Sequence, residues 1–162
     1  MTKEAAKHII VYYANIPEKI KAHNEIKDYV EKRYYDGVKS PVLSGMPHGS
    51  GSGKPTETMG LRAAQDNAGK RMDRNTVAID VLLSDQEIIE NALESMCAKY
   101  KRILLWKYVQ DYSWVKIAMT LNKPSSTVRN WHDKALLKLG EILENDCLMV
   151  EELVNRANRA YG

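Results

Sequence analysis

The sequence contains no phenylalanine and only two cysteines, Cys97 and Cys147, among its 162 residues. These cysteines form no C-x-x-C pair, which excludes a disulfide scaffold and favours two small buried residues of a reduced protein. No apolar run approaches the roughly 20 residues that a membrane span requires. The N-terminal residues carry only a short apolar patch, so we expect no secretion signal. These absences predict a cytoplasmic protein with no membrane partner.

Patterns typical of enzymes and metal proteins are also lacking. The pair Gly53-Lys54 does not complete a phosphate-binding loop, because His48 and Pro55 stand where that motif needs glycine and a hydroxyl residue. No nucleophile stands beside a plausible base. The histidines are scattered and do not approach metal-ligand spacing. We therefore expect no catalytic residue, no metal, no cofactor and no enzymatic activity.

The formal net charge of +3 hides an uneven distribution. Residues 100–139 contain eight basic and two acidic residues, a net of +6. Residues 140–162 contain two basic and five acidic residues, a net of −3, and residues 1–99 balance. A basic block of this size indicates a surface for an acidic partner such as nucleic acid.

Helical periodicity divides the chain into three regions and predicts an all-α fold. Residues 1–36 show apolar positions at three- and four-residue spacing, and Pro17 should kink this run or start a second helix. This stripe is interpreted equally well as a helix that covers a core or as a dimerising helix. Residues 37–76 are rich in Gly, Ser and Pro and predict a connector, within which residues 61–75 could add a short helix. Residues 77–162 predict a helical domain with an acidic tail.

Within this third region, Ser84 and Glu87 form a capping box, which predicts that a helix begins there. A second helix is predicted from Arg102 to about Gln110. Glu141 to Glu152 is an acidic stretch that could extend the last helix and offer a surface to a partner.

Residues 111–139 predict two helices joined by a tight turn, the spacing of a helix-turn-helix. Ser113 can cap a short helix from Trp114 to Leu121, whose apolar side is expected to hold Val115, Ile117, Ala118 and Leu121. Asn122 tolerates the left-handed backbone common at helix ends, and Pro124 can open the next helix. In that helix Val128, Ala135 and Leu139 share one face, completed by Trp131 or His132.

The outer face of this second helix predicts contact with double-stranded DNA. Arg129 can pair with guanine and Asn130 with adenine, while Asp133 can accept from cytosine or orient Arg129. Lysines such as Lys134 suit phosphates, which set orientation and salt dependence. The candidate DNA-binding residues are Ser113, Trp114, Lys116, Ser125, Ser126, Thr127, Arg129, Asn130, Asp133 and Lys134.

Residues 86–143 closely resemble region four of bacterial sigma factors. The resemblance is carried by IENAL at 89–93, KRILLWKY at 101–108, YSWVKIA at 112–118 and KALLKL at 134–139. With the N-terminal helix and the loop at 44–49, the chain resembles the small sigma-like regulators of Gram-positive phages and integrated elements, the RinA/ArpU type.

This resemblance implies a sequence-specific activator of phage or mobile-element (late) genes that reads a promoter beside host RNA polymerase in a bacterial cell. Nothing in the sequence resembles the segment of complete sigma factors that melts the −10 element, which implies an accessory factor. Two alternatives remain: a small terminase-like DNA-packaging protein, and a module that binds polymerase. A homodimer through the N-terminal helix is also expected.

Overall fold

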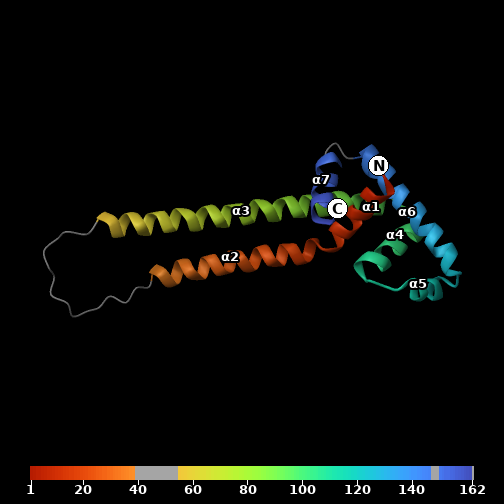
Figure 1. The fold of residues 1–162 in the computed structure, drawn as a ribbon, viewed down its shortest axis with the longest axis horizontal. Coiled ribbons are helices and arrows are strands. Elements are labelled where there is room, and N and C mark those ends of the chain that lie inside the picture. The colour runs from red at the N-terminus through yellow and green to blue at the C-terminus, as the bar shows by residue number, and fades with distance from the viewer. Residues whose placement is uncertain (39–54, 147–149, 162) are drawn as a thin grey trace. The chain divides into compact units, whose positions relative to one another are not determined.

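The computed structural model describes residues 1–38, 55–146 and 150–161, in which the regular secondary structure is helical and no strand is present (Figure 1). This confirms the predicted all-α fold. The helices are α1 (Lys3–Ala14), α2 (Ile16–Val38), α3 (Pro55–Glu94), α4 (Ala98–Leu104), the five-residue π-helix η1 (Leu105–Val109), α5 (Trp114–Leu121), α6 (Ser125–Asp146) and α7 (Val150–Tyr161).

The chain divides into two compact units. The first unit comprises Met1–Pro17 and Leu82–Gly162, and the second comprises Glu18–Val81. The boundaries of these units, at residues 17 and 81, differ from the predicted boundaries at residues 36 and 76. The difference arises because α1 packs with the C-terminal helices and because α3 is longer than the pattern of turn residues indicated.

Helix α1 covers the core of the first unit. Thr2 caps it, since its hydroxyl accepts a hydrogen bond from the Ala5 amide (3.2 Å). Its apolar stripe, including Ala6, Ile9 and Ile10, is fully buried, and the helix packs against α7 and α6 (Figure 1). Of the two interpretations of this stripe, the structure favours the core helix for residues 3–14.

Pro17 stands in the first turn of α2, so of the two predicted outcomes, a kink or a second helix, the structure has the second helix. In the second unit, α2 and α3 run side by side in opposite directions (Figure 1). His23 donates from Nδ1 to Asn75 Oδ1 (2.8 Å), and the Asn75 amide donates to the Arg71 carbonyl (2.8 Å). The polar side chain of His23 thus has its hydrogen bond inside this helix pair.

Helix α3 corrects two predictions. The second half of the predicted connector, residues 55–76, is helical, because its glycines are few and its other residues are mostly good helix formers; the short helix expected at residues 61–75 is part of α3. Ser84 does not begin a helix but lies inside α3, in its C-terminal third. A serine with a following glutamate marks a helix start only where the preceding residues are not already helical. Residues 39–54, which include the predicted loop at 44–49, lie outside the described part of the chain.

The end of the first unit differs in detail from the prediction. The helix expected from Arg102 to Gln110 begins earlier, as α4, and continues as η1 to Val109. Helix α6 extends to Asp146, and a separate helix, α7, follows from Val150. Leu153 and Ala157 of α7 are fully buried against the core.

Candidate nucleic-acid interface

Helices α5 and α6 are joined by a three-residue turn at 122–124, and local signals in the sequence explain each boundary. Ser113 caps α5, with its Oγ accepting from the Lys116 amide (3.3 Å). Asn122 ends the helix in the left-handed conformation (φ 49°, ψ 46°). The Pro124 carbonyl then accepts from the Val128 amide (3.1 Å) as α6 begins. The predicted cap and the predicted left-handed asparagine are both confirmed.

The two helices pack through a small apolar cluster of Ile117, Ala118 and Val128, which are buried. Trp106, Tyr112, Trp114 and Leu121 pack against this cluster and are partly buried. Val115 was expected on the buried side, but it is 57% exposed, so that prediction is wrong. The buried side of α5 holds Ile117, Ala118 and Leu121 as predicted, with Trp114 in place of Val115.

His132, and not Trp131, completes the inner face of α6 with Val128, Ala135 and Leu139. It is 8% exposed, and the Tyr108 hydroxyl lies 2.9 Å from its Nε2. Its Nδ1 lies 3.3 Å from Asp133 Oδ1, and the edge of its ring meets Trp114 at 4.9 Å between centroids. Burial lowers the pKa of His132, and burial likewise raises the pKa of Tyr108 to about 12.

Most of the predicted DNA-binding residues share the outer surface of α5 and α6. The exposed ones are Ser113, Lys116, Ser126, Arg129, Asn130 and Lys134. Trp114, Ser125, Thr127 and Asp133 are partly exposed. Within the described residues, Arg129 and Lys134 have no ion-pair partner, so their charges face solvent without a compensating carboxylate.

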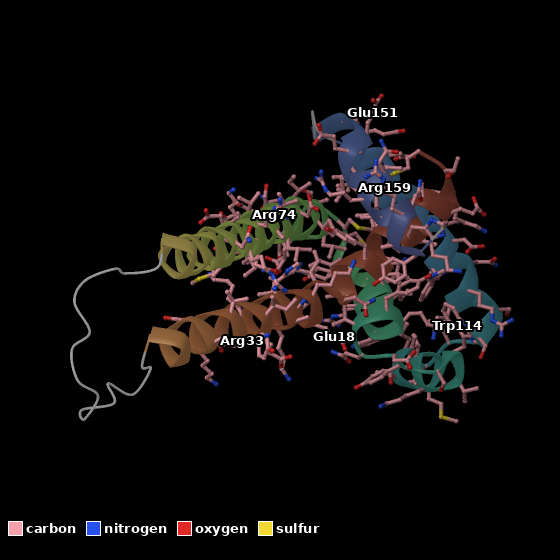
Figure 2. The ribbon with its side chains drawn as sticks, turned by 60° about the vertical axis from the view of Figure 1, so that its left-hand side comes forward. Glu18, Arg33, Arg74, Trp114, Glu151 and Arg159 are labelled. Atoms are coloured by element: carbon pink, nitrogen blue, oxygen red, sulfur yellow. The ribbon has the colours of Figure 1, made fainter. Side chains whose placement is uncertain are left out.

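Three of the predicted residues, Asp133, Lys116 and Trp114, have partners inside the protein. Asp133 lies 3.5 Å from the Lys3 ammonium of α1 and beside His132, and it does not pair with Arg129. The Lys116 ammonium lies over the Tyr112 ring, 3.4 Å from its centroid. Trp114, labelled on α5 in Figure 2, packs on His132, with the Lys107 ammonium 5.6 Å from its ring centroid.

A groove of about 480 Å³ opens beside these residues and was not predicted. Its walls come from α1, η1, α5 and α6, and its charged or aromatic lining includes Lys3, Lys7, Lys107, Tyr108, Trp114 and Asp133. The contribution of α1 could not be read from sequence, because no local signal places residues 3–7 beside residues 107–133.

The other lysines of the basic block differ in their surroundings. Lys101 pairs with Glu94, and Lys138 pairs with Glu141 (3.0 Å), so both are partly neutralised. Lys99, which directly precedes the basic block and was not singled out from the sequence, lies with its ammonium 4.3 Å from the centroid of the Trp131 ring. This contact places a positive charge on the side of α6 where Trp131 emerges.

Cys97 corrects a further prediction, because it is exposed and not buried. It immediately precedes α4, where the backbone amides of Tyr100 and Lys99 lower the pKa of its thiol. Cys147, the other predicted buried cysteine, lies outside the described residues.

The described residues contain neither a group of side chains that could bind a metal ion nor a helix that could span a membrane. No group of three or more His, Cys, Asp or Glu side chains is placed to hold a metal ion. No helix there combines the length and apolar character needed to cross a membrane.

The chain belongs to the family described as "Protein of unknown function (DUF722)", whose model matches residues 6–140. The match runs from α1 through most of α6 and so includes the α5–α6 pair. Searches of curated proteins and of solved structures found no significant match.

Proposed function

We propose that the protein is a sequence-specific DNA-binding regulator of transcription, and that α5, the turn at 122–124 and α6 form its helix-turn-helix. The observation that carries this proposal is the exposed polar start of α6 beside a left-handed turn. Arg129 lies in the second turn of α6 and Lys134 in the third, and both are exposed without an ion-pair partner among the described residues. A helix of this kind fits the major groove of DNA, where its first turns reach base edges.

The contacts divide into base readers and phosphate binders. Arg129 has the fork that pairs with the two acceptors of guanine, and the Asn130 amide pairs with adenine. Ser126 lies on the same exposed face of α6. Ser113, Lys116 and Lys134 suit phosphates, which position the protein without selecting a sequence.

The partly exposed residues have secondary parts in this scheme. Ser125 and Thr127 stand in the first turn of α6, where hydroxyls and amides meet the DNA backbone. Trp114, at the start of α5, is placed to contact the backbone beside Ser113. Asp133 forms an ion pair with Lys3. We therefore assign Asp133 to orienting side chains of the protein itself, in preference to a contact with cytosine.

The resemblance of residues 86–143 to sigma region four supports a more specific role. It favours an activator of phage or mobile-element late genes that acts with host RNA polymerase in the bacterial cytoplasm. No catalytic residue, cofactor or metal has a part in this role.

A second candidate is a protein-interaction module that binds polymerase. The observation that favours it is the apolar pair Val115 and Met119 on α5, which are 57% and 72% exposed. Exposed apolar residues one helical turn apart can contact a partner helix. The two functions are compatible, since α5 presents this pair while α6 presents the base-reading face. A terminase-like packaging protein is the remaining alternative, and ring-sized particles in light scattering would favour it.

A homodimer is also proposed, but through α2 and not α1, because the α1 stripe is buried within the chain. Ile26 and Tyr29 of α2 are 41% and 56% exposed. Sedimentation at micromolar protein, with and without DNA, tests this. A monomer under both conditions would remove the dimer from the proposal.

The DNA-binding proposal is tested with variants on a duplex selected by the wild-type protein. Arg129→Ala/Lys134→Ala should weaken binding to that duplex by about 100-fold, from roughly 1–3 kcal/mol for each lost contact. Lys70→Ala, in an exposed lysine of the second unit, is the control and should bind as the wild type does. Unchanged binding by the double variant would favour the interaction module.

A further inference from the structure

Lys99 and Trp131 form a contact between α4 and α6 that the proposed function has not used. The Lys99 ammonium lies 4.3 Å from the centroid of the Trp131 ring and 5.0 Å from that of Tyr100. A cation over an aromatic face is attracted by the ring quadrupole. The side chain of Lys99 is thus held in place at the surface, yet its charge is not cancelled by a carboxylate.

Further cations lie beside this contact. Arg102 is exposed and follows Lys99 by three residues, so the two share one side of α4. On α6, Thr127 stands four residues before Trp131, Lys134 stands three residues after it and Lys138 seven residues after it. This spacing aligns the four residues along one side of the helix. We call Lys99, Arg102, Thr127, Trp131, Lys134 and Lys138 the Lys99 strip.

The Lys99 strip is strongly basic. Among the described residues, Lys138 is its one member with an ion-pair partner, Glu141. The groove on the other side of α6 is different, since it contains Asp133 and Glu4 beside its three lysines. Charge therefore favours the Lys99 strip as the stronger anion-binding side of α6.

The Lys99 strip also borders the base-reading face. Trp131 directly follows Asn130, and Lys134 lies four residues after Asn130 and three after Trp131, on the boundary between the two surfaces. If α6 lies in a major groove, the sugar-phosphate backbones form the walls of that groove and lie along the two sides of the helix.

We propose that the Lys99 strip binds the phosphates of one DNA strand beside the major groove that α6 reads, with the Trp131 ring holding Lys99 ready for that contact. This inference rests on the proposed DNA-binding function. Lys99 and Arg102 bind phosphate oxygens, Thr127 donates its hydroxyl to the same backbone, and Trp131 contributes no base recognition.

The test measures the salt dependence of binding to the selected duplex. Each phosphate contact contributes about 0.9 to the slope of log affinity against log salt concentration. Lys99→Met/Arg102→Met should lower this slope by about 2 and weaken binding by about tenfold, on specific and scrambled duplexes alike. Lys99→Arg should retain the wild-type slope, and Lys70→Met, outside the strip, should also retain it.

The outcomes separate this inference from the proposed function. One outcome overturns the inference alone: Lys99→Met/Arg102→Met is folded by thermal melting and keeps the wild-type slope and affinity, whereas Arg129→Ala loses specific binding. A loss confined to the specific duplex would also overturn it, since phosphate contacts carry no sequence preference. If the wild-type protein selects no DNA sequence and shows no salt-dependent binding, the proposed function and this inference fail together.

Discussion

Arg156 of α7 donates two hydrogen bonds to Asp85 of α3, from Nε to Oδ2 at 2.8 Å and from Nη2 to Oδ1 at 2.6 Å. Asp85 is 1% exposed, and the Tyr12 hydroxyl of α1 donates to the same carboxylate at 2.8 Å. Three helices from distant parts of the sequence therefore meet at one carboxylate. This network joins α1, α7 and the C-terminal end of α3 within the first unit, which also carries α5 and α6.

Removing the arginine should destabilise the first unit. Arg156→Met leaves the Asp85 charge buried without its cation, which typically costs about 3–5 kcal/mol. Urea denaturation followed by circular dichroism measures this loss. Arg159→Met, in an exposed residue of the same helix (Figure 2), is the matched control and should change stability by less than about 0.5 kcal/mol. Equal stability of the two variants would show that the network contributes little.

His132 should make stability depend on pH. Burial lowers its pKa, the Lys3 and Lys107 ammoniums lower it further, and Asp133 opposes them. A neutral ring also suits its contacts, with Nε2 accepting from Tyr108 and Nδ1–H donating to Asp133. The pKa of His132 in the folded protein lies below the unfolded value of about 6.5. The contribution of His132 to the free energy of unfolding is therefore full above that pH and is lost as the pH falls below it.

The corresponding measurement is the free energy of unfolding between pH 7 and pH 5, for the wild type and His132→Gln. We expect the wild type to lose more stability over this interval than the variant does. Parallel losses in both proteins would mean that His132 is not the group responsible.

Asn122 should tolerate glycine and reject β-branched residues. Its φ of 49° lies in the left-handed region, where Asn and Gly are accepted and a β-branched side chain is strained. Asn122→Gly should leave stability within about 0.5 kcal/mol of the wild type, whereas Asn122→Val should cost about 1–3 kcal/mol. Thermal melting of both variants checks this, and similar melting temperatures would contradict the assigned turn geometry.

Features specified by neighbouring residues could be predicted from the sequence. The Ser113 cap, the left-handed Asn122 and the helix that starts with Pro17 in its first turn each depend on a few adjacent residues, and the structure has all three. The register of α5 was misjudged at Val115, because eight residues contain barely two turns from which to read a stripe. Ser84 was misread because its flanking residues carry the helix through it.

Features that depend on distant residues could not be predicted. Asp85 resembles an exposed residue of a first turn, and only its distant partners, Arg156 71 residues later and Tyr12 73 residues earlier, explain its burial. The contacts of Lys3 with Asp133 and of Lys99 with Trp131 likewise join helices whose packing has no local signal. The candidate interface was therefore predictable along α6, whereas the side chains that border it came from the fold.

The most direct test of the central claim, that α6 reads DNA sequence, is selection of bound duplexes from a random pool by the wild type and by Arg129→Met in parallel. We predict that the wild type enriches a single motif containing guanine, and that Arg129→Met loses the preference at that guanine while keeping the neighbouring positions. Each good bidentate contact is worth about 1–3 kcal/mol of discrimination, enough to be plain in the enriched sequences. No enriched motif, or the same motif from both proteins, would contradict the account.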